Sequence, residues 1–182
     1  MFIKESQEME RKLVSYNEYI RELARKDALT GLMNRRSMLE SIEEMLSSSP
    51  NNRSFCIAIS DIDLFKSVND SYGHEVGDAA LKIISDYLEN YMKKRGYVAR
   101  WGGEEFLFVF HDGNGDEVKI ELETMRAEIE KLDFSHISKD LHVTMTFGLE
   151  EYDPTKPIDT SITNADKKLY LGKNSGRNKV IF

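Results

Sequence analysis

The stretch RWGGEEF, residues 100–106, separates Val98 from the apolar run FLFVF at residues 106–110. Two β-type segments joined through Gly-Gly predict a hairpin, because glycine tolerates the positive φ angles that tight hairpin turns require. The two glycines also carry no side chains, so a bulky anionic group can approach the backbone there. The two glutamates place carboxylates at the turn, where a folding core has no use for them. Taken alone, the stretch is equally compatible with a polar hairpin tip.

A second acidic cluster lies upstream in DIDLFKSVNDSYGHEVGDAAL, residues 61–81. The run FCIAI at residues 55–59 has the composition of a strand buried on both faces. We therefore expect Asp61 and Asp63 just past the carboxyl end of that strand, pointing to the same side. Carboxylates are hard oxygen ligands suited to Mg²⁺. If the Glu104 hairpin is the neighbouring strand, carboxylates from both regions converge on one metal site; a solvated strand-end loop is the alternative.

Four blocks of the chain together resemble the GGDEF-domain diguanylate cyclases, with GGEEF as a variant of the family signature. The resemblance covers nearly everything from Asp27 to the C-terminus. In chain order the blocks are DALTGLMNRR (27–36), the metal and guanine block (61–78), the signature (100–106) and the closing helix and loop ADKKLYLGKNSGRN (165–178). Each block alone is a moderate signal, and their shared order makes the resemblance specific.

The composition agrees with a single domain. A length of 182 residues fits one domain with a helical extension. The net charge of −7 argues against a general nucleic-acid binder. The lone Cys56 lies in an apolar run and is interpreted as a small core residue, so no disulfide framework is expected. No apolar run approaches the roughly 20 residues of a membrane span, and the charged N-terminus is unlike a signal peptide. We expect a cytoplasmic polypeptide, or the cytoplasmic part of a larger protein.

The N-terminal segment is expected to form a separate helix. Residues 1–25 are interpreted as a signalling or dimerisation helix and residues 26–182 as the GGDEF domain. Apolar residues at spacings of four and three form a short coiled-coil seam at Met9, Leu13, Tyr16, Ile20 and Leu23. A helix packed on its own domain is the alternative. The segment resembles the helix that usually joins such a domain to an upstream sensor, and no sensor is recognisable within this chain.

The remaining patterns predict the order of elements. Helices are expected at residues 35–47, about 76–94, 117–132 and 159–172, with strands at 55–60, 97–110 (the hairpin), 142–149 and 179–182. This order predicts a split β-α-β arrangement, an antiparallel or mixed sheet with helices on one face. The resemblance implies an α/β (α+β) class and a palm-like nucleotidyl cyclase fold, with a central, mainly antiparallel sheet flanked by helices.

The chemistry that the resemblance implies is the condensation of two GTP molecules into cyclic di-GMP with release of two pyrophosphates. It implies Asp61 and Glu104 as ligands of Mg²⁺, or of Mn²⁺ as the alternative ion, together with the carbonyl oxygen of Ile62. Glu104 is also the implied proton acceptor, and Glu105 completes or orients the metal shell. Asp63 keeps its place in the motif and is expected to have a supporting role.

Further positions match nucleotide contacts. Asn69 and Asp78 match the guanine readers of the family. An Asp can accept from guanine N1–H and the exocyclic amine, whereas adenine would leave it unpaired. Both residue types are also common in turns and helix starts. Leu64, which stands where an aromatic is frequent, and Phe65 fall where backbone amides contact phosphates. Lys66 supplies an ammonium and is counted among the catalytic residues.

The C-terminal block adds positive charge. Lys173 and Arg177 are interpreted as ligands of the β- and γ-phosphates, although a basic helix end that offsets the macrodipole is the alternative. Many family members bind their product at an Arg-x-x-Asp site, whose positions are Lys93 and Gly96 here. We therefore expect no inhibitory site at these positions. Arg95 lies out of register with them.

The resemblance implies one GTP per protomer, so a homodimer is the expected working form. A different class of function is a catalytically silent GGDEF domain that acts as a GTP- or cyclic dinucleotide-binding module. Such domains usually show erosion of the signature or metal positions, which are intact here. An enzyme that makes mixed cyclic dinucleotides is a third possibility, against which Asp78 argues.

Overall fold

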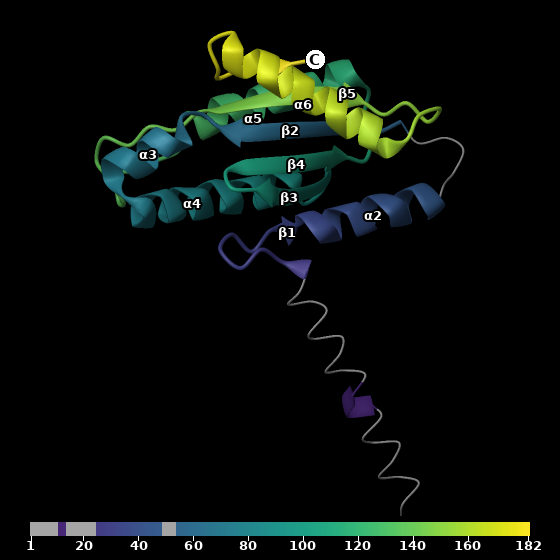
Figure 1. Ribbon diagram of the computed structural model, residues 1–182, viewed down its shortest axis with the longest axis horizontal. Coiled ribbons are helices and arrows are strands. Elements are labelled where there is room, and N and C mark those ends of the chain that lie inside the picture. The colour runs from purple at the N-terminus through teal and green to yellow at the C-terminus, as the bar shows by residue number, and fades with distance from the viewer. Residues whose placement is uncertain (1–10, 14–24, 49–53) are drawn as a thin grey trace, which may run out of the picture.

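A computed structural model describes residues 11–13, 25–48 and 54–182. At its centre lies a six-stranded sheet with strand order β1-β3-β4-β2-β5-β6 (Figure 1). The strands are β1 (Met33–Asn34), β2 (Cys56–Ile62), β3 (Gly96–Gly102), β4 (Glu105–Phe110), β5 (Met145–Glu151) and β6 (Val180–Ile181). The four longer strands pair antiparallel, and the two short edge strands pair parallel with their neighbours. The predicted mainly antiparallel sheet is confirmed.

Helices account for most of the rest of the domain: α2 (Arg35–Ser48), α3 (Phe65–Tyr72), α4 (His74–Met92), α5 (Gly115–Ile129) and α6 (Ile158–Asn174). The four predicted helices are present with shifted ends. The sequence did not predict α3, which begins after Leu64 in a left-handed conformation (φ 55°). Gly73, with φ 86°, separates α3 from α4. Of the predicted N-terminal seam only Leu13 is described, and its side chain is exposed; Met9, Tyr16, Ile20 and Leu23 lie outside the described residues.

Two hydrophobic cores lie on opposite faces of the sheet. On β4, Phe106 and Phe108 belong to a core completed by residues of α3, α4 and α5. Leu107 and Val109 belong to a second core completed by residues of α2 and α6. The prediction that helices cover only one face is wrong, because the central strands are apolar on both faces and both need a cover.

Close backbone contact fixes α6 on the sheet. Gly148 of β5 lies directly under α6, and a Cβ at this position would collide with the carbonyl oxygen of Ala165 and the amide nitrogen of Leu169. Glycine is therefore required for this approach. The seating of α6 determines where its last turn, which carries Lys173, lies relative to β2.

Candidate functional site

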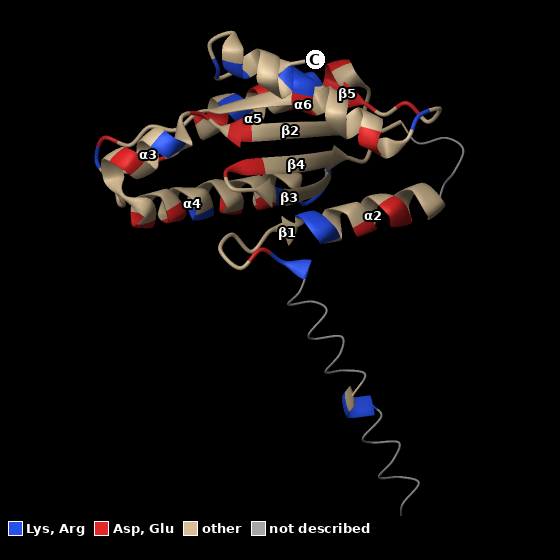
Figure 2. Cartoon of the chain, viewed as in Figure 1, with Lys and Arg blue, Asp and Glu red and all other residues tan. Residues whose placement is uncertain are grey.

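The two acidic regions meet where β2 and β4 pair. Asp61 lies opposite Glu105 in the antiparallel register, and the Ile62 amide donates to the carbonyl oxygen of Glu104 at 3.2 Å. The prediction that the hairpin is the neighbour of this strand is confirmed, and Figure 2 shows the acidic ends of β2 and β4 side by side. Asp61 lies within β2 rather than just past its end, because the strand continues through Ile62.

The signature turn is tied to the start of the domain. Gly103 adopts φ +39°, the left-handed region that glycine tolerates. The Arg100 guanidinium donates through Nε to the Gly103 carbonyl oxygen at 2.8 Å and through Nη1 to Asp27 Oδ1 at 3.0 Å. Burial opposes the charge of Asp27, but hydrogen bonds from Thr30 and Arg100 outweigh it and lower the pKa of Asp27. The sequence interpretation missed this bridge, although both partners fall in matched blocks.

Asp61 has a strongly perturbed environment. Only 7% of the Asp61 surface is exposed, and this burial raises the pKa of Asp61 from 3.8 to about 6. The Lys173 ammonium, 2.7 Å from Asp61 Oδ2, opposes this rise, whereas the charges of Glu104 and Glu105 add to it. The site therefore concentrates negative charge where a cation already lies against one carboxylate.

The donor set fits a divalent cation without forming a complete shell. Among residues 11–13, 25–48 and 54–182, no group of three or more His, Cys, Asp or Glu is close enough to hold a metal ion. Asp61 nevertheless pairs with the Lys173 ammonium, and Glu104 and Glu105 add to the rise that burial causes in the pKa of Asp61. A divalent cation bound beside these carboxylates would offset their negative charge. Carboxylate and carbonyl oxygens are the ligands that Mg²⁺ prefers.

Asp63 has a different set of partners from Asp61. Its buried carboxylate accepts hydrogen bonds from the hydroxyls of Thr144 and Thr146 and from the backbone amide of Asn178. Within the described part of the chain, Asp61 pairs with Lys173, whereas Asp63 is held by two threonines and a backbone amide. Asp63 instead links β2 to the segment after α6.

The two predicted guanine readers lie at the junction of α3 and α4. Gly77 packs so closely against Asn69 that a Cβ at residue 77 would collide with the Asn69 Oδ1 atom. This contact places Asn69 of α3 against the turn of α4 that carries the exposed Asp78. Lys66 and Leu64 are exposed at the start of α3, and Phe65 is buried. Lys66 is therefore exposed to solvent on α3, the helix that follows β2.

Of the two predicted C-terminal cations, Lys173 reaches β2, where it forms an ion pair with Asp61. Arg177 is exposed in the loop after α6, where it has φ +61°. Position 93 is the C-cap of α4, and position 96 is the first residue of β3. Lys93 Nζ donates to Asn90 Oδ1 at 2.7 Å, and a Cβ at Gly96 would collide with the Val109 carbonyl oxygen.

Arg95, the other cation of that region, is held by its neighbours. Its guanidinium lies over the Tyr91 ring, 4.2 Å from the centroid. It also pairs with Glu121 Oε2 at 3.0 Å and donates to the Tyr91 carbonyl oxygen at 2.6 Å. Nearby, the Tyr87 hydroxyl donates to Glu128 Oε2 at 2.7 Å, which further joins α4 to α5.

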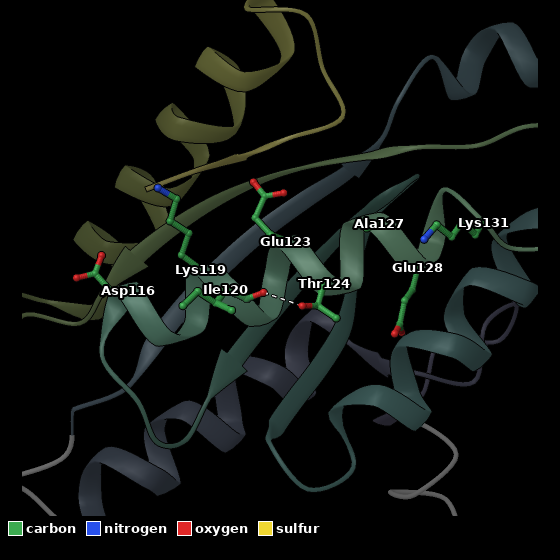
Figure 3. Close-up of a pocket in the computed structure, with 8 residues that line it drawn as sticks. All are labelled: Asp116, Lys119, Ile120, Glu123, Thr124, Ala127, Glu128 and Lys131. Atoms are coloured by element: carbon green, nitrogen blue, oxygen red, sulfur yellow. Dashed lines mark hydrogen bonds between the residues drawn. The ribbon is translucent and has the colours of Figure 1, made fainter.

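A hollow of about 710 Å³ lies along α5 (Figure 3). It is lined by Asp116, Lys119, Ile120, Glu123, Thr124, Ala127, Glu128 and Lys131. None of these residues belongs to the predicted site. A smaller hollow of about 300 Å³ lies between α3 and the segment before β5, and Asp63 and Leu64 are among its lining residues.

The chain belongs to the GGDEF-domain diguanylate cyclase family. The family model described as "Diguanylate cyclase, GGDEF domain" matches residues 24–179. The chain is 34% identical over 157 residues to the diguanylate cyclase DgcZ of Escherichia coli, which covers 86% of this chain and 52% of DgcZ. The chain spans about half the length of DgcZ, and 40% and 25% of the related DgcM and DgcP.

Solved structures agree with this assignment. The coiled coil and GGDEF domain of DgcB from Caulobacter crescentus, in complex with c-di-GMP, superimposes with a TM-score of 0.88 at 26% identity, covering 98% of this chain and 96% of that one. The active GGEEF domain of a diguanylate cyclase from Vibrio cholerae gives a TM-score of 0.72 at 25% identity, covering 82% and 96%. Within the described residues, no helix is long and apolar enough to cross a membrane.

Proposed function

We propose that this domain condenses two GTP molecules into cyclic di-GMP and two pyrophosphates. The observation that carries the proposal is the pairing of β2 with β4, which brings the Asp61 strand end against Glu104 and Glu105, with Lys173 beside them. Membership of the diguanylate cyclase family and the intact GGEEF signature support the same reaction.

One set of residues would hold the metal ion, and a second set would bind the phosphate oxygens. Asp61, Glu104 and Glu105, with the Ile62 carbonyl oxygen, would hold Mg²⁺ or Mn²⁺, which when bound neutralises the triphosphate and stabilises the departing pyrophosphate. Phosphate oxygens are bound by Lys66, Lys173 and Arg177 and by backbone amides at Leu64 and Phe65. Lys173 is suited to this role because its ammonium already lies 2.7 Å from Asp61 of β2.

The reaction at each α-phosphate is a direct displacement. The 3′-oxygen of one ribose forms a bond to the α-phosphorus of the other GTP, while the bond from that phosphorus to the bridging oxygen of pyrophosphate breaks. Glu104 accepts the proton of the attacking hydroxyl, a role suited to a carboxylate at the turn next to the α-phosphate. Two such displacements close the ring.

Guanine is selected by Asn69 and Asp78. The Asp78 carboxylate accepts from guanine N1–H and its amine, and the Asn69 amide supplies a complementary donor. Adenine lacks this pair of donors and would leave the carboxylate without partners. The packing of Asn69 on Gly77 supports this role, because it sets the amide beside the helical turn of Asp78.

Catalysis by this route requires two protomers, each presenting one bound GTP to the other. We propose that the helix expected from the sequence of residues 1–25 promotes this homodimer and connects the domain to an upstream sensor in the cytoplasm. The solved DgcB structure, whose coiled coil precedes a GGDEF domain, supports this arrangement.

We further propose that product does not inhibit the enzyme through positions 93 and 96. No side chain fits at Gly96, and the neighbouring Arg95 is already engaged by Tyr91 and Glu121. Calorimetry of cyclic di-GMP with a Glu104→Ala variant should show weak binding or none. Submicromolar, non-competitive inhibition of the parent would contradict the proposal.

The deciding experiment is incubation with GTP and Mg²⁺, followed by chromatography of the products. Glu104→Ala should abolish turnover, whereas Glu89→Ala, at an exposed position on α4, should leave it unchanged. Glu104→Ala activity within about threefold of the parent, a barrier change of only about 0.65 kcal/mol, would contradict the assignment. Tight GTP binding by the parent without any turnover would instead identify a binding module.

A further inference from the structure

The segment after α6 has an unusual backbone. Gly176, Arg177 and Asn178 have φ angles of +108°, +61° and +46°, so three consecutive residues are left-handed. Left-handed conformations are unfavourable for residues with a Cβ and persist only where the surroundings hold them. A backbone of this kind next to the proposed nucleotide site points to a constraint on the position of Arg177.

The constraint comes from two sides and converges on Asn178. On the sheet side, the Asn178 amide donates to Asp63 Oδ2 at 3.0 Å. On the α5 side, Arg126 Nη1 donates to Asn178 Oδ1 at 2.8 Å. Arg126 is itself fixed by Glu123 and Glu130 of the same helical surface, at 2.8 and 3.1 Å. Figure 3 shows Glu123 extending from α5.

Asp63 is the more deeply seated of the two anchors. Its residue is 7% exposed. Thr144 Oγ1 donates to Oδ2 at 2.7 Å, and Thr146 Oγ1 donates to Oδ1 at 2.6 Å. Hydrogen bonds to an ionised acceptor are stronger than those between neutral groups. The carboxylate is therefore oriented by β5 and the residue before it, and presents Oδ2 to the loop.

We propose that Asp63 is a positioning residue that holds the 175–178 loop so that Arg177 reaches the phosphates of the bound nucleotide. Two contacts hold the loop near the end of β2: Lys173, before the loop, pairs with Asp61 of β2, and the Asn178 amide, within the loop, donates to Asp63, which directly follows β2. Arg177, between them, is exposed and free to point at a ligand at that strand end. Asp63 thus acts on the nucleotide through Arg177, and this role rests on the proposed function.

The hydrogen bond from the Asn178 amide to Asp63, called the tether below, is tested first without nucleotide. In Asp63→Asn, amide hydrogen exchange at Asn178 should accelerate at least tenfold, because the Asn side chain can no longer offer two ionised acceptors. Asp86→Asn, an equal charge change at an exposed position on α4, should leave this rate unchanged. If Asp63→Asn does not fold, Thr144→Val provides the same test, since its hydroxyl orients the same carboxylate oxygen. Unchanged exchange at residue 178 would overturn the tether.

The effect on phosphates is tested with a double-mutant cycle. The ligand is 3′-deoxy-GTP with Mg²⁺, which lacks the attacking hydroxyl and is not turned over. Asp63→Asn should weaken its binding about tenfold in the parent and less than twofold in an Arg177→Ala background. Equal losses in both backgrounds would overturn the positioning role. A parent that binds no 3′-deoxy-GTP would overturn the proposed function and the phosphate role, while the exchange rates would still decide the tether.

Discussion

Replacing Asp61 with Asn should stabilise the folded protein at neutral pH while removing its activity. Burial, reinforced by Glu104 and Glu105 and opposed by Lys173, raises the pKa of Asp61 from 3.8 to about 6. The folded state therefore binds this proton more tightly than the unfolded state. The stability that this tighter proton binding adds to the folded state is fully present below a pH of about 4. It is lost as the pH rises through about 6.

The magnitude follows from the pKa of Asp61. Each tenfold change in proton affinity corresponds to about 1.4 kcal/mol. The rise from 3.8 to about 6 thus lowers the free energy of unfolding at pH 7.5 by at most about 3 kcal/mol. This figure already includes the attraction of Lys173. Because Asn is neutral at every pH, we expect Asp61→Asn to recover about 1–3 kcal/mol, or roughly 2–10 °C in Tm.

Urea denaturation of parent and variant between pH 7.5 and pH 4 measures this difference. The gain should shrink as the pH falls through 6 towards 4, because Asp61 becomes protonated in the folded state over this range. Asp27→Asn is the matched control with the opposite sign, because the pKa of Asp27 is lowered in the folded state. It should destabilise the protein at neutral pH, and the loss should fade in acid. An Asp61→Asn variant less stable than the parent at pH 7.5 would refute the reasoning.

Three further predictions concern packing, specificity and assembly. Gly148→Ala should lower the free energy of unfolding by about 1–3 kcal/mol, because its methyl group meets the backbone of α6; denaturation with no loss would contradict the close contact. Gly77→Ala should displace the Asn69 amide and weaken GTP binding several-fold, yet leave the free energy of unfolding within about 1 kcal/mol of the parent. Calorimetry that shows unchanged GTP affinity would argue against Asn69 as a guanine reader. Deleting residues 1–24 should lower specific activity at dilute protein and matter less at high concentration. Specific activity that stays flat on dilution, with no dimer in ultracentrifugation, would show that the N-terminal seam does not drive assembly.

The parts of the fold that could be predicted are those with a strong local pattern. The run before Asp61 is apolar at successive positions, which is typical of a strand buried on both faces, and the Gly-Gly turn indicated the hairpin. The two-residue β1 is too short to show any periodicity. The eight-residue α3 is too short as well, and it starts from a left-handed Leu64 that no glycine or asparagine announces.

The site was predictable only where the register of the sheet determines it. The approach of Glu104 to Asp61 follows from pairing the hairpin with the neighbouring strand. The contact of Lys173 with Asp61 depends on how α6 lies on Gly148, which no local pattern encodes. The partners of Asp63 lie far away in the sequence, and their threonine hydroxyls leave no periodic trace.

The bridge between Asp27 and Arg100 has a mechanical consequence. A single oxygen, Asp27 Oδ1, accepts from the backbone amides of Leu29 and Thr30, from the Thr30 hydroxyl and from Arg100. Arg100 in turn donates a hydrogen bond to the carbonyl oxygen of Gly103, the residue before the proposed proton acceptor Glu104. Asp27 and the signature turn are therefore joined through one arginine, so that a displacement of the Asp27 carboxylate would also displace the Gly103 carbonyl.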